Sequence, residues 1–161
     1  MNIWRVIKGL AFKELRRLAL LFIRHPLKIY PTFRATKETI AICDRLYDKV
    51  HHGHGPANAF RHALWNALIA RHAYAITGNA EAAASWVKQF TDLHEELSPN
   101  NAIEKAMDLH NNRIGRELFL MNPENSTAAI MELIRSQVAE AVLISKQQDI
   151  KKYPNQLICI E

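Results

Sequence analysis

The stretch ANAFRHALWNALIARHAYAI, residues 57–76, decides the fold class of this chain. It is rich in alanine and leucine, which are strong helix formers, and it contains neither glycine nor proline. Pro56 in front of it suits the first position of a helix, and Gly78-Asn79 behind it are a normal helix end. The pattern therefore predicts a long helix over residues 57–76.

The segments on either side of this stretch repeat the helical character. Further helices are predicted over residues 35–50, 80–97, 101–121 and 127–146. Residues 156–160 alone have the character of a strand, and no second strand is predicted to pair with it. Because the connections are short and favour antiparallel neighbours, the sequence predicts an all-α protein, a compact bundle of about six helices.

Composition and length agree with one helical domain. The chain has 161 residues, 48% of them hydrophobic and 23% charged, and only 5 glycines and 6 prolines, which excludes a disordered chain and a many-turned β-sandwich. Cys43 and Cys159 share no motif spacing, which excludes zinc ribbons and redox pairs. We expect free thiols in a reducing compartment, and hence a cytoplasmic protein.

The N-terminus is basic and apolar at once, and we divide the chain into a basic amphipathic helix, residues 1–30, and a single helical domain, residues 31–161. Residues 1–34 carry eight lysines and arginines and one acid, a net charge of +7, whereas the other 127 residues sum to −2. Charges in the middle of the segment exclude a transmembrane span and disfavour a cleaved signal. Its predicted apolar stripe consists of Trp4, Ile7, Ala11, Leu15, Leu18 and Phe22.

Two interpretations of this helix stay open. Residues 3–24, from Ile3 to Arg24, could lie on an anionic membrane surface, which would make the protein peripheral to the inner membrane. Alternatively, the stripe packs on the domain and the charges face water. No recognisable nucleic-acid motif accompanies the positive charge, and the sequence does not indicate an oligomeric state.

Three of the predicted helices place polar residues at helical spacing where a core is expected. They are Asn58, Arg61, His62 and Trp65 on the first, Asp92 and Glu95, with His94 beside them, on the second, and Asp108, Asn111 and Asn112, with Gly115 at the same spacing, on the third. Gly115 would let another backbone or a ligand approach closely. If the three faces meet, their desolvation is costly unless the groups pair with one another or with a ligand. The pattern therefore predicts one polar site.

The residue types of this site favour hydrolysis. Metalloprotease, phosphate-loop and serine-elbow patterns are absent from the sequence, which disfavours those chemistries. The groups that remain suit general acid–base work or a divalent metal such as zinc, acting on a phosphoester or a membrane lipid. The predicted catalytic residues are His62, Asp92, His94, Glu95 and Asp108, with His62, His94, Asp92 and Asp108 as metal ligands, and Asn58, Arg61, Trp65, Asn111 and Asn112 as substrate-binding residues.

Two other classes of function stay open. The chain could be a membrane-peripheral module that binds a headgroup without catalysis, or a structural or interaction domain whose buried polar network fixes the register of its helices. Arg61 could bind an anion or merely pair with Asp92 or Glu95.

Three sequence blocks resemble those of a bacterial family of unknown function. They read Asn58-Ala-Phe-Arg61-His62-Ala-Leu-Trp65, Asp92-Leu-His94-Glu95 and Met107-Asp108-Leu-His-Asn111-Asn112-Arg-Ile-Gly115, within a resemblance that covers residues 24–120. Members of that family include C-terminal domains of Rhs-type polymorphic toxins and small stand-alone proteins. The resemblance implies an enzyme-like site without an established reaction. This chain differs from the toxin-fused members in having no delivery domain, which weakens the expectation of a toxin.

Overall fold

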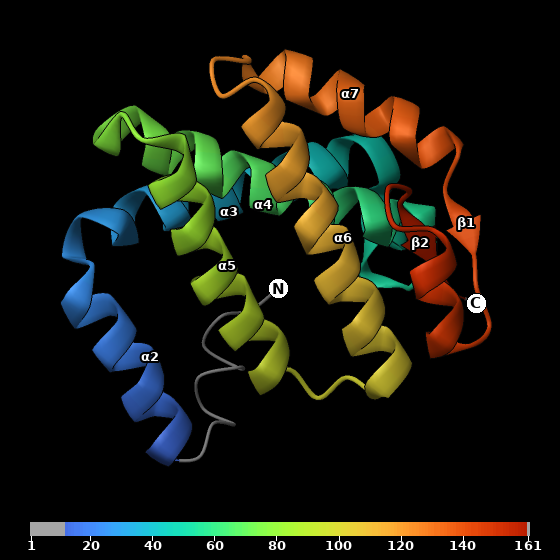
Figure 1. Cartoon of the computed structure of the whole chain (residues 1–161), viewed down its shortest axis with the longest axis horizontal. Helices are drawn as coiled ribbons and strands as arrows, with labels where there is room; N and C mark the ends of the chain where they lie inside the picture. The colour runs from blue at the N-terminus through green and yellow to red at the C-terminus, as the bar shows by residue number, and fades with distance from the viewer. Residues whose placement is uncertain (1–11, 161) are drawn as a thin grey trace.

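The structure, a computed structural model, describes residues 12–160, with side chains from residue 16 onward. Within that range the predicted all-α bundle is confirmed, and six α-helices are present (Figure 1). They are α2 (Phe12–Arg24), α3 (Ile29–Tyr47), α4 (Pro56–Thr77), α5 (Ala80–Leu97), α6 (Ala102–Met121) and α7 (Thr127–Ala139). Three short 3-10 helices, η1 (Pro26–Lys28), η2 (Asp48–His52) and η3 (Gln147–Lys152), and two strands, β1 (Val142–Leu143) and β2 (Ile158–Cys159), complete the fold.

Helix α4 lies at the centre of the bundle. It packs against α3, α5, α6 and α7, so that it is covered on several sides at once (Figure 1). This arrangement explains why its sequence is apolar almost all round rather than on one stripe. Phe60, Leu64, Leu68 and Ile69 are completely buried in the core. Three polar residues of this helix, Asn58, His62 and Asn66, are therefore buried as well.

The crossing of α4 and α6 depends on Gly115. A Cβ atom built on Gly115 would lie 2.1 Å from the carbonyl oxygen of Ala63, far closer than any van der Waals contact. The backbones of α4 and α6 can come this close only because residue 115 is a glycine and has no side chain. Ala63 follows His62, and Asn112 lies one helical turn before Gly115, so the close crossing brings these two polar residues together.

Helix α3 differs from the predicted range of residues 35–50. It begins at Ile29, because Pro31 falls in the first turn, where a missing N–H removes no helical hydrogen bond. It ends at Tyr47, because Asp48 has a φ of 49°, a left-handed backbone conformation that does not continue a helix. The chain then forms η2, which carries His51 and His52.

The prediction of a helix over residues 127–146 is wrong for its C-terminal part. Helix α7 ends at Ala139, and Val142–Leu143 pair in parallel with Ile158–Cys159. The N–H groups of Val142 and Ile144 donate to the carbonyls of Leu157 and Cys159, both at 2.9 Å. The strand expected near residues 156–160 therefore has a partner, because the end of the chain folds back beside Val142–Leu143.

The basic N-terminal helix is confirmed for the part that the structure describes. The predicted stripe residues up to Leu15 lie outside the described side chains, while Phe22 packs its ring 6.0 Å from that of Phe90. Arg17 donates to both carboxylate oxygens of Glu96, at 2.6 and 2.8 Å. Among residues 12–160, no helix combines the length and the apolar character that crossing a bilayer requires. Cys43 and Cys159 are both free and buried.

Candidate functional site

The site is built around His62, which α4 presents to α5 and α6. Its Nδ1 atom lies 3.5 Å from Oε1 of Glu95 on α5, and its Nε2 atom lies 3.3 Å from Oδ1 of Asp108 on α6. At most 5% of each of these three side chains is exposed to solvent. One imidazole thus stands between two carboxylates in the interior of the protein.

The hydrogen bonds around His62 determine which of its ring nitrogens carries the proton. Asn112 donates from Nδ2 to Glu95 at 3.0 Å, so its Oδ1 faces His62 Nδ1 at 3.2 Å and accepts from it. The guanidinium of Arg61, which has only donors, lies 2.7 Å from His62 Nε2. Both contacts fit a ring that donates from Nδ1 and accepts at Nε2.

Asp108 has one satisfied oxygen and one that no donor reaches. Its Oδ2 accepts from Nδ2 of Asn100 at 2.9 Å, whereas Oδ1 is buried without a hydrogen-bond partner. Burial raises the pKa of this carboxyl above its ordinary value. Burial by itself would raise the pKa of Glu95, but its neighbours His62, His94 and Asn112 lower it below its ordinary value. A buried oxygen without a partner is costly and points to a proton or a cation at this position.

Arg61 connects the buried cluster with a pocket. Its second terminal nitrogen donates to the carbonyl oxygen of His51 at 2.8 Å, and His51 is itself held by Asp44, 2.8 Å from its Nε2. Burial lowers the pKa of the guanidinium, which is poorly solvated although it carries a charge. It is thus poised for an anion that reaches it.

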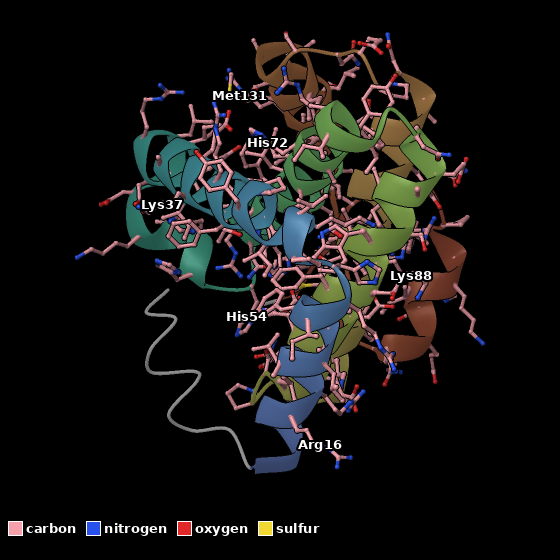
Figure 2. The ribbon with its side chains drawn as sticks, turned by 90° about the vertical axis from the view of Figure 1, so that its left-hand side faces the viewer. Arg16, Lys37, His54, His72, Lys88 and Met131 are labelled. Atoms are coloured by element: carbon pink, nitrogen blue, oxygen red, sulfur yellow. The ribbon has the colours of Figure 1, made fainter. Side chains whose placement is uncertain are left out.

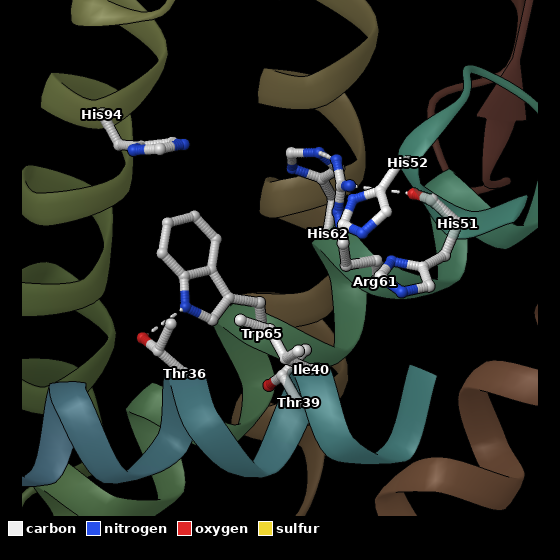
Figure 3. A pocket seen from close by; sticks show the side chains of 9 residues that line it. All are labelled: Thr36, Thr39, Ile40, His51, His52, Arg61, His62, Trp65 and His94. Carbon is white, nitrogen blue, oxygen red and sulfur yellow. Dashed lines mark hydrogen bonds between the residues drawn. The ribbon is translucent and has the colours of Figure 1, made fainter. Parts of the chain in front are cut away.

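The pocket lies between α3, η2, α4 and α5 and reaches Arg61 and His62 (Figure 3). Trp65 forms one wall, because its Nε1 donates to Thr36 Oγ1 at 2.8 Å and this contact fixes the indole. Figure 3 shows Trp65 and His94 on one side of the pocket, with His51, His52 and Arg61 on the other. The rings of Trp65 and His94 meet edge to face at 5.0 Å, and burial lowers the pKa of His94, which favours its neutral form.

A layer of residues that the sequence analysis missed supports the cluster. Asn66 donates to Asn112 Oδ1 at 2.6 Å and accepts from Thr91 at 3.0 Å and Arg116 at 2.9 Å. All of these side chains are buried. Two of them could have been found from the sequence. Asn66 lies four residues after His62, and Arg116 lies four residues after Asn112, so each shares a helix face with a site residue.

The structure brings together most of the predicted site residues but not all of them. Asp92 pairs with Lys88 on the surface of α5 and does not join the cluster. Asn58 donates to the Gly53 carbonyl at 2.5 Å, which ties the loop after η2 to α4. Asn111 faces the opposite side of α6 and makes two hydrogen bonds with the backbone of Ile158.

Replacing Asn111 by alanine is expected to lower the free energy of unfolding by about 2 kcal/mol or more, because two buried backbone groups of Ile158 lose their partners. Chemical denaturation measures the loss, with Asn122→Ala, at an exposed position, as the control. An Asn111→Ala variant as stable as the control would contradict this structural role.

Three side chains of the cluster are suited to hold a metal ion. His62, Glu95 and Asp108 each offer one ligand atom, and these atoms lie within 4.8 Å of one another. Imidazole and carboxylate are ordinary ligands of Zn²⁺, and Asp108 Oδ1, which lacks a donor, fits this use. Compared with the ligands predicted from the sequence, Glu95 takes the place of Asp92 and His94.

Comparison with known proteins gives one match. The model of a family described as "Domain of unknown function (DUF6973)" matches residues 19–142 of this chain. No curated protein and no solved structure matches it. The matched range contains α3 to α7 and hence every residue of the His62 cluster.

Proposed function

The chain belongs to the family of domains of unknown function DUF6973, and from the geometry of its buried cluster we propose that it is a metal-dependent hydrolase of phosphoesters. His62, Glu95 and Asp108 hold a divalent cation, and Arg61 binds the anionic phosphoryl group. Asn112, Asn66 and Asn100 orient these side chains. The resemblance to toxin domains stays a prediction.

One observation carries this proposal. The lone pair on His62 Nε2 and the buried Oδ1 of Asp108 lie 3.3 Å apart. Two electron-rich atoms repel each other at this distance unless a cation or a proton lies near both. Arg61 lies within hydrogen-bond distance of Nε2 and its charge acts on Asp108 too, but it makes no hydrogen bond to Oδ1. A divalent cation would satisfy both atoms, and Glu95 lies close enough to complete the set.

Each side chain of the site has a separate role in the proposed hydrolysis. A divalent cation bound here would lower the pKa of a coordinated water and polarise the phosphoryl group. Arg61 stabilises negative charge on the phosphoryl oxygens as the water oxygen attacks phosphorus and the bond to the leaving oxygen breaks. A carboxylate of the cluster accepts the proton of the water, and that proton ends on the leaving alcohol. The products are a phosphate monoester and an alcohol when the substrate is a diester.

The pocket favours a substrate with an apolar or flat group next to its phosphate. Ile40 and Trp65 are apolar residues of the pocket wall, whereas Arg61 supplies a positive charge to it. In the present arrangement Arg61 covers His62 Nε2. An anion that draws the guanidinium toward the pocket would uncover this nitrogen, which couples substrate binding to the completion of the site.

The proposal is tested by titrating the full-length protein with Zn²⁺ and Mn²⁺ in a calorimeter and by assaying a chromogenic phosphodiester. We expect one bound ion per chain and activity that a chelator removes and added metal restores. Asp108→Asn keeps the shape of the side chain and should weaken metal binding by about tenfold or more, since it removes a charged ligand. Asp149→Asn, the same change on the surface of η3, serves as the control.

Each other outcome identifies a different function. Activity that survives complete chelation would mean that His62 and Glu95 catalyse the reaction as general acid and base, without a metal. No metal binding and no turnover, together with a loss of stability in Asp108→Asn, would assign the cluster a structural role. Asp92 lies outside the cluster. If Asp92→Asn weakened metal binding as much as Asp108→Asn does, the proposed set of ligands would be wrong.

A further inference from the structure

The corner where α2, η1 and α3 meet exposes an unusual number of large apolar side chains. We call residues 16–37 the α2–α3 corner; Figure 2 looks onto it, between the labelled Arg16 and Lys37. Ile23 is 73% exposed, Leu27 75% and Tyr30 70%, and Leu20, Ile29 and Phe33 are also exposed. Single apolar residues on a surface are normal, but six of them in one corner are typical of an interaction site.

The packing of α2 does not account for these residues. On its inner side Leu21 and Phe22 pack against the core, with the Phe22 ring on Phe90. Leu20 and Ile23 point away from that contact and remain exposed. On α3, Tyr30 and Phe33 are three residues apart and share an exposed face. The apolar surface is thus additional to what the fold requires.

The same corner is strongly positive. Residues 16–37 contain six lysines and arginines and no acid, a net charge of +6, and since the whole chain has +5, all other residues together sum to −1. Arg17 is engaged with Glu96. Lys37 and Phe33 lie together, with Nζ 4.9 Å from the ring centre. Cations therefore alternate with apolar side chains over the whole corner.

We propose that the α2–α3 corner docks on the surface of an anionic lipid bilayer. Ile23, Leu27 and Tyr30 enter the headgroup region, and the neighbouring arginines and lysines contact lipid phosphates. Each cation near such a surface contributes about 1 kcal/mol, and the apolar side chains add the free energy of their transfer from water. A nucleic acid would match the charge but not the aliphatic side chains between the charges. This docking does not depend on the proposed hydrolase activity.

Vesicle co-sedimentation of the full-length protein tests the proposal. We expect binding to phosphatidylcholine vesicles that contain about a third phosphatidylglycerol, and at least tenfold weaker binding to pure phosphatidylcholine. The variant Ile23→Ser/Leu27→Ser/Tyr30→Ser should lose at least about tenfold in binding without a change in Tm, since these side chains are exposed. The matched control is Val50→Ser/Met121→Ser, whose native side chains are 72% and 79% exposed elsewhere.

A second pair of variants separates the contribution of charge. Arg24→Gln/Lys28→Gln should weaken binding by about tenfold, whereas Lys49→Gln/Lys151→Gln, outside the corner, should have a much smaller effect. Equal binding by the serine variant and the native chain would overturn the proposal. So would a concentration-dependent dimer in sedimentation that the serine variant abolishes, because the corner would then bind a second copy of the chain.

Discussion

Replacing Gly115 by alanine is expected to destabilise the protein by about 3 kcal/mol or more. The added Cβ would lie 2.1 Å from the carbonyl oxygen and 2.7 Å from the Cα of Ala63, all of them backbone atoms that no rotamer change can move. Alanine is a better helix former than glycine by about 1 kcal/mol, but this gain is smaller than the cost of forcing two packed helices apart. Thermal and denaturant unfolding measure the loss.

The control for this substitution is Gly55→Ala. Nothing lies within 4 Å of a Cβ built on Gly55, and its φ of −77° suits any residue, so we expect little change in stability. If Gly115→Ala does fold, the separation of α4 and α6 should also draw His62 away from Asn112 and lower metal affinity. A Gly115→Ala variant as stable as the native chain would mean that the two helices do not cross at this point.

Replacing His62 by glutamine is expected to reduce phosphodiester hydrolysis by about 100-fold or more. Glutamine retains a polar group of similar length, but it cannot supply the aromatic nitrogen that faces Asp108 and Arg61. Initial rates with and without added Zn²⁺ measure the effect. A metal titration of the same variant shows whether the lost activity results from weaker binding of the cation.

The stability of this variant must be measured beside its activity. His54→Gln, at a partly exposed histidine 3.5 Å from Glu104, makes the same chemical change outside the cluster and should keep both activity and Tm. A His62→Gln variant that loses stability and binds metal as well as the native chain does would assign His62 to the packing of the helices. Full activity in His62→Gln would end the proposed function.

The sequence predicted the helices well where local signals were strong. Helix α5 has the predicted bounds, and α6 begins after Asn101, whose side chain caps it and forms a capping box with Glu104. The ends of α3 and α7 were mispredicted because a backbone conformation and a strand pairing decide them, and neither is a helix signal in the sequence. The backbone of Asp48 ends α3, and β1 forms only because residues far along the chain pair with it.

The polar faces could be found in the sequence, because helical spacing is a local property that residues on one helix share. The sequence by itself determined that the chain is helical, that its longest apolar helix carries Arg61 and His62, and that two other helices carry carboxylates and amides. It could not determine which of these side chains meet. Asp92 and Glu95 are three residues apart on α5, yet only Glu95 lies beside His62.

Tertiary structure alone decided the membership of the site. The rotation of α5 and the close crossing of α6 over α4 at Gly115 set which side chains point inward, and a rotation of one residue, about 100°, would have presented others. Packing of the whole core fixes that rotation, because each helix buries the face that best fills the space left by its neighbours. The same packing turned Asn111 toward β2 and Asn112 toward His62, although they are adjacent in the chain.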